Sequence, residues 1–246
     1  TYKLNKETNS VTDEEVTMLW ANMIGNVTVS AISDINYRDG RSIHGIVNKH
    51  PTDQTTPDAL KKADFLAMPL TPVAPTQDGI NVEFKHTMSK INLTIELGSE
   101  YEFTQEDVDT KITDVKIDGS KVEAFYHINT SNYDPQFQFS GHFGDPTPIS
   151  PYRTGTKPYS KTDGKAKATY EAILIPQTIA SGNFTVSFKV DGKLYEWTYN
   201  KELTLASTTA YTLKLTAGDD KVQPVSFSVA PWNPGNGENG ENKETD

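Results

Sequence analysis

Histidine and carboxylate side chains are the first residues of this chain to consider for metal binding or acid–base catalysis. The five histidines, His44, His50, His86, His127 and His142, form no His-x-His or His-x-x-x-His pair. Cysteine is absent, which excludes thiolate zinc sites, cysteine nucleophiles and disulfides together. A metal site would need carboxylates gathered from several loops. We therefore expect no metal ion and no other cofactor.

Short catalytic motifs are missing as well. The chain has no Gly-x-Ser-x-Gly elbow, no Walker loop and no dinucleotide fingerprint. Residues 34–40 only faintly resemble a calcium loop, because Arg38 occupies a ligand position and the distal glutamate is lacking. Adjacent carboxylates at residues 14–15 and 106–107 do not converge on one substrate, since neighbours in a strand point to opposite faces. We therefore predict that the protein is not an enzyme.

Individual histidines and arginines have ordinary structural explanations. His86 lies on the apolar side of a predicted strand, which favours a buried, hydrogen-bonded histidine over a ligand or general base. His44 and His50 flank a polar loop and are expected at the surface. Arg38 and Arg41, two of only three arginines, lie in one polar turn. That turn is either an ordinary exposed loop or a processing site for a trypsin-like protease, which needs a flexible arginine.

Residues 129–165 are rich in proline, glycine, serine and aromatic side chains. Between Tyr133 and Tyr159, loop aromatics could stack on sugar rings, and an exposed cluster would mark a binding surface. The same rings could instead plug the ends of a β sandwich. If the rings stack on sugars, the alternative function is that of a surface glycan-binding protein.

The composition is acidic, with a formal net charge of −10 and a pI of about 5.0 over 246 residues. Negative charge repels phosphate backbones and anionic membranes, so nucleic acid is not expected as a partner. No apolar run approaches the roughly 18–20 residues of a membrane span. The chain starts at Thr1 rather than methionine, so we expect a mature or trimmed chain whose targeting segment has been cut off.

The elements that must position these residues are strands, and the longest candidate covers residues 82–97. Apolar and polar side chains alternate there, but the apolar set changes from even to odd positions between Met88 and Ile91. Either an extra residue at Ser89-Lys90 forms a β-bulge, or the strand crosses from one sheet to another.

The clearest hairpin spans residues 184–199. A two-residue turn at Asp191-Gly192 fixes the register and places Phe188 opposite Tyr195, with the large apolar side chains on one face.

Other local patterns are weaker. Residues 112–128, with Asp118-Gly119 as the turn, predict a second hairpin. Residues 99–109 are expected to form an acidic loop, and residues 59–65 one helical turn.

Short strands with frequent turn signals indicate an all-β sandwich protein. Residues 13–23 are the main ambiguity, because a strand and a capped helix both fit them. We predict an N-terminal β sandwich over residues 1–132 and a C-terminal β sandwich over residues 133–233. Residues 234–246 cannot bury enough apolar surface to order, so a disordered polar tail is expected.

Four parts of the sequence, in order, resemble the fimbrillin-like family, the type V pilus subunits and related surface proteins of Bacteroidales. They are residues 63–67 (ADFLA) with 82–91 (VEFKHTMSKI), residues 173–177 (ILIPQ), residues 211–213 (YTL) and residues 231–232 (PW). The resemblance covers about residues 16–232.

The resemblance implies two tandem transthyretin-like antiparallel β sandwiches in a non-enzymatic pilus subunit or adhesin, with a tip, stalk or accessory role. Members are lipoproteins displayed on the outer membrane. Some polymerise after an Arg-specific protease removes the first strand, because a neighbour's strand then fills the groove. Partners would be other pilus subunits or a second copy, with glycans or proteins of host or bacterial surfaces as further partners.

This chain departs from the family pattern in three places. It lacks the lipid-bearing cysteine, its first 62 residues match poorly, and residues 235–246 lack alternating apolar side chains. A C-terminal donor strand would therefore have to come from Val225, Phe227 and Val229.

Overall fold

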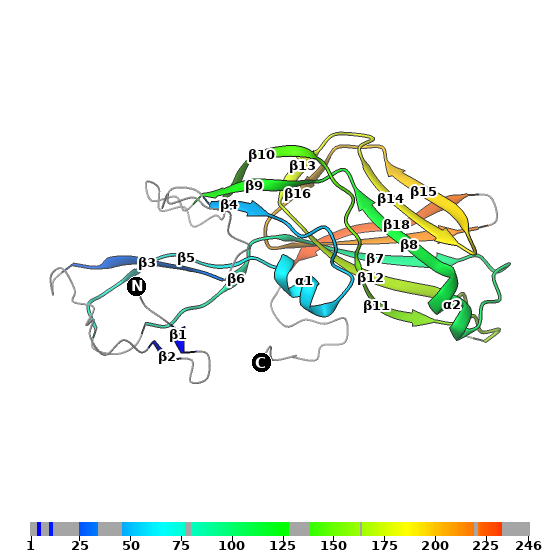
Figure 1. Cartoon of the computed structure of the whole chain (residues 1–246), viewed down its shortest axis with the longest axis horizontal. Coiled ribbons are helices and arrows are strands. Elements are labelled where there is room, and N and C mark those ends of the chain that lie inside the picture. The colour runs from blue at the N-terminus through cyan, green and yellow to red at the C-terminus, as the bar shows by residue number, and fades with distance from the viewer. Residues whose placement is uncertain are drawn as a thin grey trace. The chain divides into compact units, whose positions relative to one another are not determined.

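The computed structural model describes residues 4–5, 10–11, 25–33, 46–76, 80–127, 138–162, 164–218 and 221–232. Within these residues the chain consists mainly of β strands, with two short helices (Figure 1). It separates into two compact units. One is made of Thr1–Val29 and Thr71–Asn81, and the other of Ser30–Leu70 and Val82–Asp246. The prediction of an all-β protein is confirmed.

Two small sheets contain the strands of the N-terminal region. Leu4–Asn5 (β1) pairs antiparallel with Ser10–Val11 (β2). Val27–Ile32 (β3), Leu66–Val73 (β5) and Lys85–His86 (β6) form a second sheet in the order β3-β5-β6.

Helix α1, Pro57–Ala63, precedes β5. The hydroxyl of its N-cap residue Thr56 accepts a hydrogen bond from the backbone N–H of Ala59, and Pro57 suits the first turn because it has no N–H to satisfy. The helical turn predicted over residues 59–65 is thus present and starts two residues earlier.

The largest sheet has five strands in the order β11-β12-β7-β17-β18. They are Tyr152–Lys157 (β11), Lys167–Leu174 (β12), Ser89–Leu97 (β7), Thr209–Ala217 (β17) and Val222–Pro231 (β18). Neighbours run antiparallel except β7 and β17, which are parallel. Every second side chain of β7 is buried, which places one face of this sheet against the core.

A second layer faces this sheet (Figure 1). Its strands are Ile112–Asp118 (β8), Phe184–Val190 (β14) and Lys193–Tyr199 (β15), in the order β15-β14-β8, and the two-stranded ladder of Gln177–Ile179 (β13) and Leu203–Leu205 (β16). Buried side chains of both layers, among them Leu93, Leu213 and Phe188, pack into one core. This part of the molecule is a β sandwich.

A third group of strands lies beside the sandwich. Ile46–Lys49 (β4), Lys121–His127 (β9) and Gln138–Pro146 (β10) form an antiparallel sheet in the order β10-β9-β4. The register of β10 shifts twice along β9, which bends the strand.

The hairpin predicted over residues 184–199 is confirmed in its register. Phe188 lies opposite Tyr195 in the β14–β15 ladder. Asp191 and Gly192 have φ angles of 50° and 81°, so both turn residues adopt the left-handed conformation that a type I′ turn requires.

We expect Gly192→Ala to lower the free energy of unfolding by about 1 kcal/mol, as measured by urea denaturation. No heavy atom lies within 4 Å of the added Cβ, so the loss comes from backbone strain alone. Asp191→Asn is the control, because asparagine tolerates this conformation. Equal stabilities for wild type and Gly192→Ala would contradict the assigned turn.

The apolar side chains of residues 82–97 change from even to odd positions where the chain passes from one sheet to another. β6 pairs with β5, whereas β7 pairs with β12 and β17. Ser89 and Lys90 are regularly paired with β12, so the β-bulge reading is wrong and the crossing reading is right. Thr87 fixes the crossing, since its N–H and its hydroxyl both donate to the Phe65 carbonyl.

The hairpin predicted over residues 112–128 is wrong. The chain turns near Gly119, but β8 pairs with β14, and β9 pairs with β4 and β10. The turn residues predicted the bend near Gly119 correctly. The two strands that flank the bend nevertheless pack into different sheets, and this decides the pairing partner of each.

The loop expected over residues 99–109 contains most of helix α2, Gln105–Lys111. Thr104 and Asp107 form a capping box at its start. Hydrogen bonds from Lys111 and Thr104 lower the pKa of Asp107 to about 2. The acidic residues that suggested a loop are therefore the first turn of a helix, where negative charge is favourable.

The compact units do not follow the boundary predicted between residues 132 and 133. β7 precedes that boundary and pairs with β12 and β17, which follow it. The core of the sandwich likewise takes side chains from both sides. Residue 132 itself and the predicted tail, residues 234–246, lie outside the described residues.

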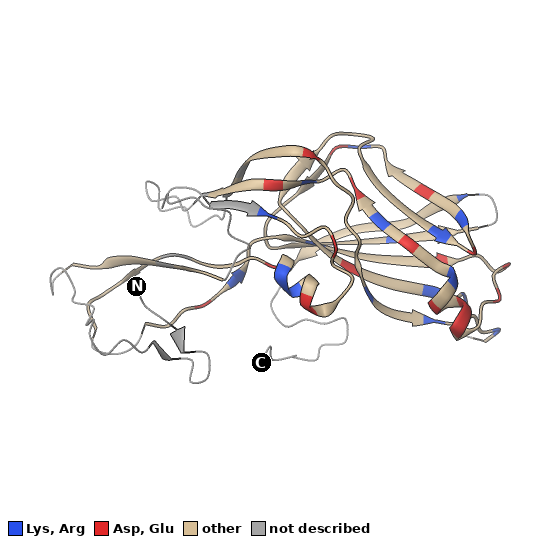
Figure 2. Cartoon of the chain, in the orientation of Figure 1, with Lys and Arg blue, Asp and Glu red and all other residues tan. Residues whose placement is uncertain are grey.

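Acidic and basic side chains are interspersed along the strands of the second unit (Figure 2). Glu96 on β7 pairs with Lys214 at 2.6 Å and with Lys165 at 3.3 Å, and Lys90 pairs with Glu171 at 2.8 Å. Each such solvent-facing pair contributes at most about 1 kcal/mol. Their main consequence is a mixed-charge outer face on the five-stranded sheet.

Candidate binding pocket and exposed strand edge

Sequence segments that lie far apart in the chain meet in a second hydrophobic cluster. Its buried members are Ala63, Phe65, Ala67, Met88, Ala124, Tyr126, Ile173 and Ile175. Phe65 meets Tyr126 edge to face, with ring centroids 4.7 Å apart. Trp232 and Phe139 pack at the border of the cluster. The residues that carry the family resemblance at 63–67, 82–91, 173–177 and 232 therefore share one site.

His86 contacts the residue at the end of β18, the last strand. The Trp232 ring stacks on it, with centroids 3.8 Å apart and planes 11° apart. His86 Nδ1 lies 2.7 Å from Oδ2 of Asp64, the C-cap residue of α1. The Trp232 N–H donates to the Thr208 carbonyl. The expected core histidine is thus a partly buried residue that fixes the end of β18 near α1.

Gln54 takes the place of a strand partner at the end of β12. Its fully buried side chain accepts a hydrogen bond from the Ile173 N–H at 2.8 Å and donates one to the Ile173 carbonyl at 2.8 Å. In a β sheet, a neighbouring strand would bond the N–H and the carbonyl of Ile173. The pairing of β11 with β12 extends only to Glu171, so Gln54 bonds these two groups instead. Sequence reasoning missed Gln54, since a lone glutamine in a polar loop gives no signal.

His50 lies beside Gln54 and is buried, so its predicted surface position is wrong. The loop folds back on β9, where the His50 N–H donates to the Val122 carbonyl. Nε2 of the ring faces the Ile173 carbonyl and therefore carries the proton. Nδ1 is a buried acceptor without a hydrogen-bond partner among the described residues. Burial lowers the pKa of His50 to about 4, although the bond to Ile173 opposes this shift.

Gln177 repeats this arrangement between β13 and β9. Its Oε1 accepts from the Lys121 N–H and its Nε2 donates to the Lys121 carbonyl, both at 2.9 Å. Nε2 also donates to the Ile175 carbonyl at 3.1 Å. The glutamine of the Pro-Gln pair is therefore a structural link between two sheets.

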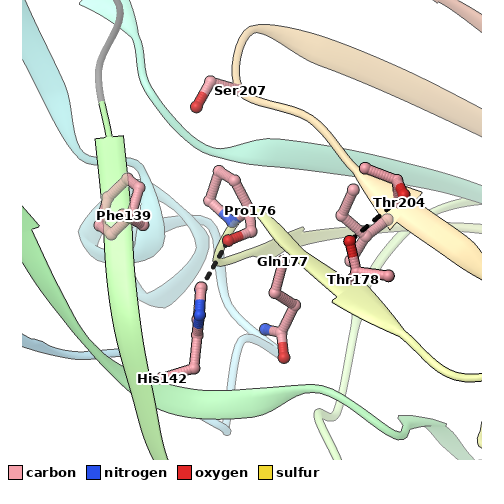
Figure 3. A pocket seen from close by; sticks show the side chains of 8 residues that line it. Phe139, His142, Pro176, Gln177, Thr178, Thr204 and Ser207 are labelled. Carbon is pink, nitrogen blue, oxygen red and sulfur yellow. Dashed lines mark hydrogen bonds between the residues drawn. The ribbon is translucent and has the colours of Figure 1, made fainter.

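A pocket of about 510 Å³ opens between β10 and the β13–β16 ladder (Figure 3). Its lining residues are Phe139, His142, Pro176, Gln177, Thr178, Thr204, Leu205 and Ser207. His142 Nε2 donates to the Pro176 carbonyl at 2.7 Å, and the hydroxyls of Thr178 and Thr204 are 3.3 Å apart. This volume lies within the roughly 300–1,000 Å³ of small-molecule sites, but the pocket is shallow and widely open to solvent.

The loop aromatics singled out between Tyr133 and Tyr159 have different positions. Phe139 lines the pocket, whereas Tyr159 packs against the core of the sandwich and Phe143 against Phe125, with centroids 5.3 Å apart. Tyr133 lies outside the described residues. Tyr159 and Phe143 therefore pack against other side chains, whereas Phe139 faces the pocket.

The predicted processing residues Arg38 and Arg41, and His44 beside them, lie outside the described residues. Arg153 is described and belongs to β11, where its guanidinium donates to the carbonyls of Asp109 and Ile112 at the end of α2.

The candidate donor residues all belong to β18, at the edge of the five-stranded sheet. Phe227 lies opposite Leu213 and packs against Tyr199, with ring centroids 5.2 Å apart. Val225 and Val229 are 55% and 58% exposed. Val225 is the extra residue at a register shift of the β17–β18 ladder. β18 thus presents apolar side chains that its own fold covers only in part.

The described residues contain no group of three or more histidine and carboxylate side chains placed to hold a metal ion. Both described helices are seven residues long, which is too short to cross a membrane.

The sequence model of the fimbrillin-like family matches residues 1–232. Among solved structures, a proposed cell adhesion protein of Bacteroides uniformis ATCC 8492 is similar, with a TM-score of 0.58 and 19% identity over 92% of this chain and 81% of that one. A proposed cell adhesion protein of Bacteroides ovatus ATCC 8483 has a TM-score of 0.61 and 16% identity, over 91% and 75%. At these identities the likeness concerns the fold. No curated protein matches the sequence.

Proposed function

This chain belongs to the fimbrillin-like family, and from that premise we propose that it is a non-enzymatic pilus subunit or adhesin on the cell surface. The family match over residues 1–232 carries the proposal. The two similar solved proteins, themselves proposed to act in cell adhesion, agree with it. Export to the outer membrane through a lipidated leader, and assembly with other pilus subunits or a second copy, belong to the same proposal.

The geometry of β18 supports assembly by strand exchange. Within the described part of the chain, β18 pairs with β17 alone. An edge strand offers a row of backbone donors and acceptors, and alternate apolar side chains can enter pockets of a partner. Within β18, Val222 and Phe227 are the described hydrophobic residues that pack against the core. On leaving its own sheet the strand would lose these contacts and the stacking of the following Trp232 on His86.

We expect the double variant Val225→Asp/Val229→Asp to stop fibre formation. The charges would have to enter apolar pockets of the neighbour, whereas in the monomer both positions are exposed and stability should change by less than about 1 kcal/mol. Negative-stain electron microscopy after limited Arg-specific proteolysis is the measurement. Ser226→Asp/Ser228→Asp is the matched control, because both serines are exposed on the alternate positions of β18.

The donor role of β18 is wrong if the valine variant still forms fibres, or if the serine control stops them equally. A wild-type protein that stays monomeric after proteolysis removes the polymerising version of the proposal and leaves an accessory or adhesin role.

An Arg-specific protease is expected to cut after Arg38 or Arg41 and to spare Arg153. The guanidinium of Arg153 is bound to the end of α2 and lies over the Tyr170 ring, 5.4 Å from its centroid, so this segment must unfold before a protease can bind it. N-terminal sequencing should find a product beginning at residue 39 or 42. Early cleavage after Arg153 would contradict the prediction.

A further inference from the structure

We infer that the pocket between β10 and the β13–β16 ladder binds a neutral saccharide unit, an inference that rests on the proposed role at the cell surface. A pyranose ring has apolar C–H faces and a rim of hydroxyl groups. A complementary site therefore needs an apolar wall and a few fixed polar groups beside it. The pocket has both (Figure 3).

The apolar wall is formed by Phe139 and Pro176, and Leu205, which is buried in the core of the sandwich, closes the pocket from below. Phe139 is held in place from behind by the second hydrophobic cluster. Its ring centroid lies 5.3 Å from that of Tyr126 and 6.1 Å from that of Phe65. A ring fixed in this way can offer a surface to a ligand without first losing conformational freedom.

The polar wall is formed by Thr178 and Thr204. They lie directly opposite each other in the β13–β16 ladder, and both side chains are exposed. Each hydroxyl is both donor and acceptor, as the hydroxyls of a sugar are. The ladder sets the spacing of the two groups, so adjacent hydroxyls of one sugar ring can be bound together.

Two further lining residues hold the pocket in shape. The amide of Gln177 is engaged with Lys121 and Ile175, so it forms a fixed wall. The ring of His142 is fixed as well, because its Nε2 donates to the Pro176 carbonyl. The frame of the site thus exists before any ligand binds.

The lining also argues against two other ligand classes. As far as the structure describes it, the pocket is lined by no lysine, arginine, aspartate or glutamate, and the chain as a whole has a net charge of −10. An anionic ligand would find no counter-charge there. Pro176 has no N–H, and its carbonyl is already bound by His142, so a guest peptide strand could not continue the β13 edge at this point.

Saturation-transfer difference NMR tests the inference with the intact chain. The probes are methyl β-D-galactopyranoside, methyl β-D-glucopyranoside and N-acetylglucosamine, with N-acetylneuraminic acid as the anionic comparison. We expect saturation transfer to at least one neutral probe, with a dissociation constant on the order of millimolar for so small a ligand, and none to the anionic one. No transfer to any neutral probe would overturn the inference.

Variants place the binding in the pocket. Thr178→Val/Thr204→Val removes both hydroxyls at constant shape and should weaken binding about fivefold or more, and Thr204→Trp should block the pocket. The control is Thr185→Val/Thr198→Val, which alters the corresponding cross-strand pair of the β14–β15 ladder and should leave binding unchanged. Unaltered binding in both pocket variants would place the saccharide elsewhere and overturn the site.

Three outcomes separate this site from the other hypotheses. Displacement of the bound probe by a synthetic peptide of residues 222–232 would assign the pocket to a strand and overturn the saccharide reading. A chain that forms fibres but binds no neutral probe would overturn this site alone. A chain that binds the probe in the pocket but never forms fibres would support the site and remove the polymerising version of the proposed function.

Discussion

Gln54→Leu is expected to lower the free energy of unfolding by about 3–5 kcal/mol. Gln54 is fully buried, and its amide bonds both the N–H and the carbonyl of Ile173 and also reaches the Pro51 carbonyl. Leucine fills a similar volume but leaves the Ile173 N–H buried without a partner. Each buried polar group left unsatisfied costs about 1–3 kcal/mol, and the lost hydrogen bonds add to this.

Urea denaturation at neutral pH measures the loss of stability. Gln54→Glu provides a second test of the same hydrogen bonds. Glutamate has the same shape and can accept from the Ile173 N–H, but an ionised carboxylate cannot donate to the carbonyl. It should therefore destabilise the fold as strongly as leucine, and less at acid pH, where the carboxyl is protonated. Gln223→Leu, at an exposed position of β18, is the control and should change stability by less than about 0.5 kcal/mol. A Gln54→Leu variant as stable as this control would refute the assigned role.

Between pH 6.5 and pH 4 the folded protein is expected to lose about 3 kcal/mol of stability through His50 alone. The pKa of His50 falls from 6.5 to about 4 on folding, because burial disfavours the charged ring. Above pH 6.5 the ring is neutral in both states and the stabilisation is complete. In the window between the two values the unfolded chain binds a proton that the folded one does not, so stability falls by up to about 1.4 kcal/mol per pH unit.

Comparison with His50→Gln isolates this effect. Glutamine can still donate to the Ile173 carbonyl but has no proton that titrates in this range, so the variant should have a shallower slope of stability against pH from 6.5 to 5. Its absolute stability is not the readout. Asp107, whose pKa is about 2, loses its stabilisation only at more acid pH and does not interfere. Equal slopes for wild type and His50→Gln would contradict the buried, neutral state of His50.

The parts of the fold that could be predicted from the sequence are those fixed by neighbouring residues. Asp191 and Gly192 can both adopt positive φ, and this fixes the turn, the register and the buried face of β14 and β15 together. Asp118-Gly119 provided a similar turn signal, and there the hairpin prediction was wrong. β8 pairs instead with β14, and β9 pairs with β4, both of which lie far away in the chain, and with β10, the next strand.

The candidate sites depended even more on distant contacts. Gln54 and His50 lie in what reads as a polar surface loop, yet both are bound to Ile173, more than a hundred residues away. The pocket unites β10 with β13 and β16, and its threonines have no recognisable motif. Phe139 belongs to the aromatic region that suggested glycan binding, and the sequence could not tell this ring from those that fill the core.

The sequence by itself determined the all-β class, the main hairpin and the family, and the donor role of β18 stays a prediction. Alternation and turn residues act over a few positions, so these properties can be read locally. Tertiary structure alone decided that residues 63–67, 82–91, 173–177 and 232 form one cluster, that His50 is buried, and that a cavity opens beside Phe139. The physical reason is that burial, pKa and cavity shape depend on which distant strands become neighbours, and no local pattern encodes that choice.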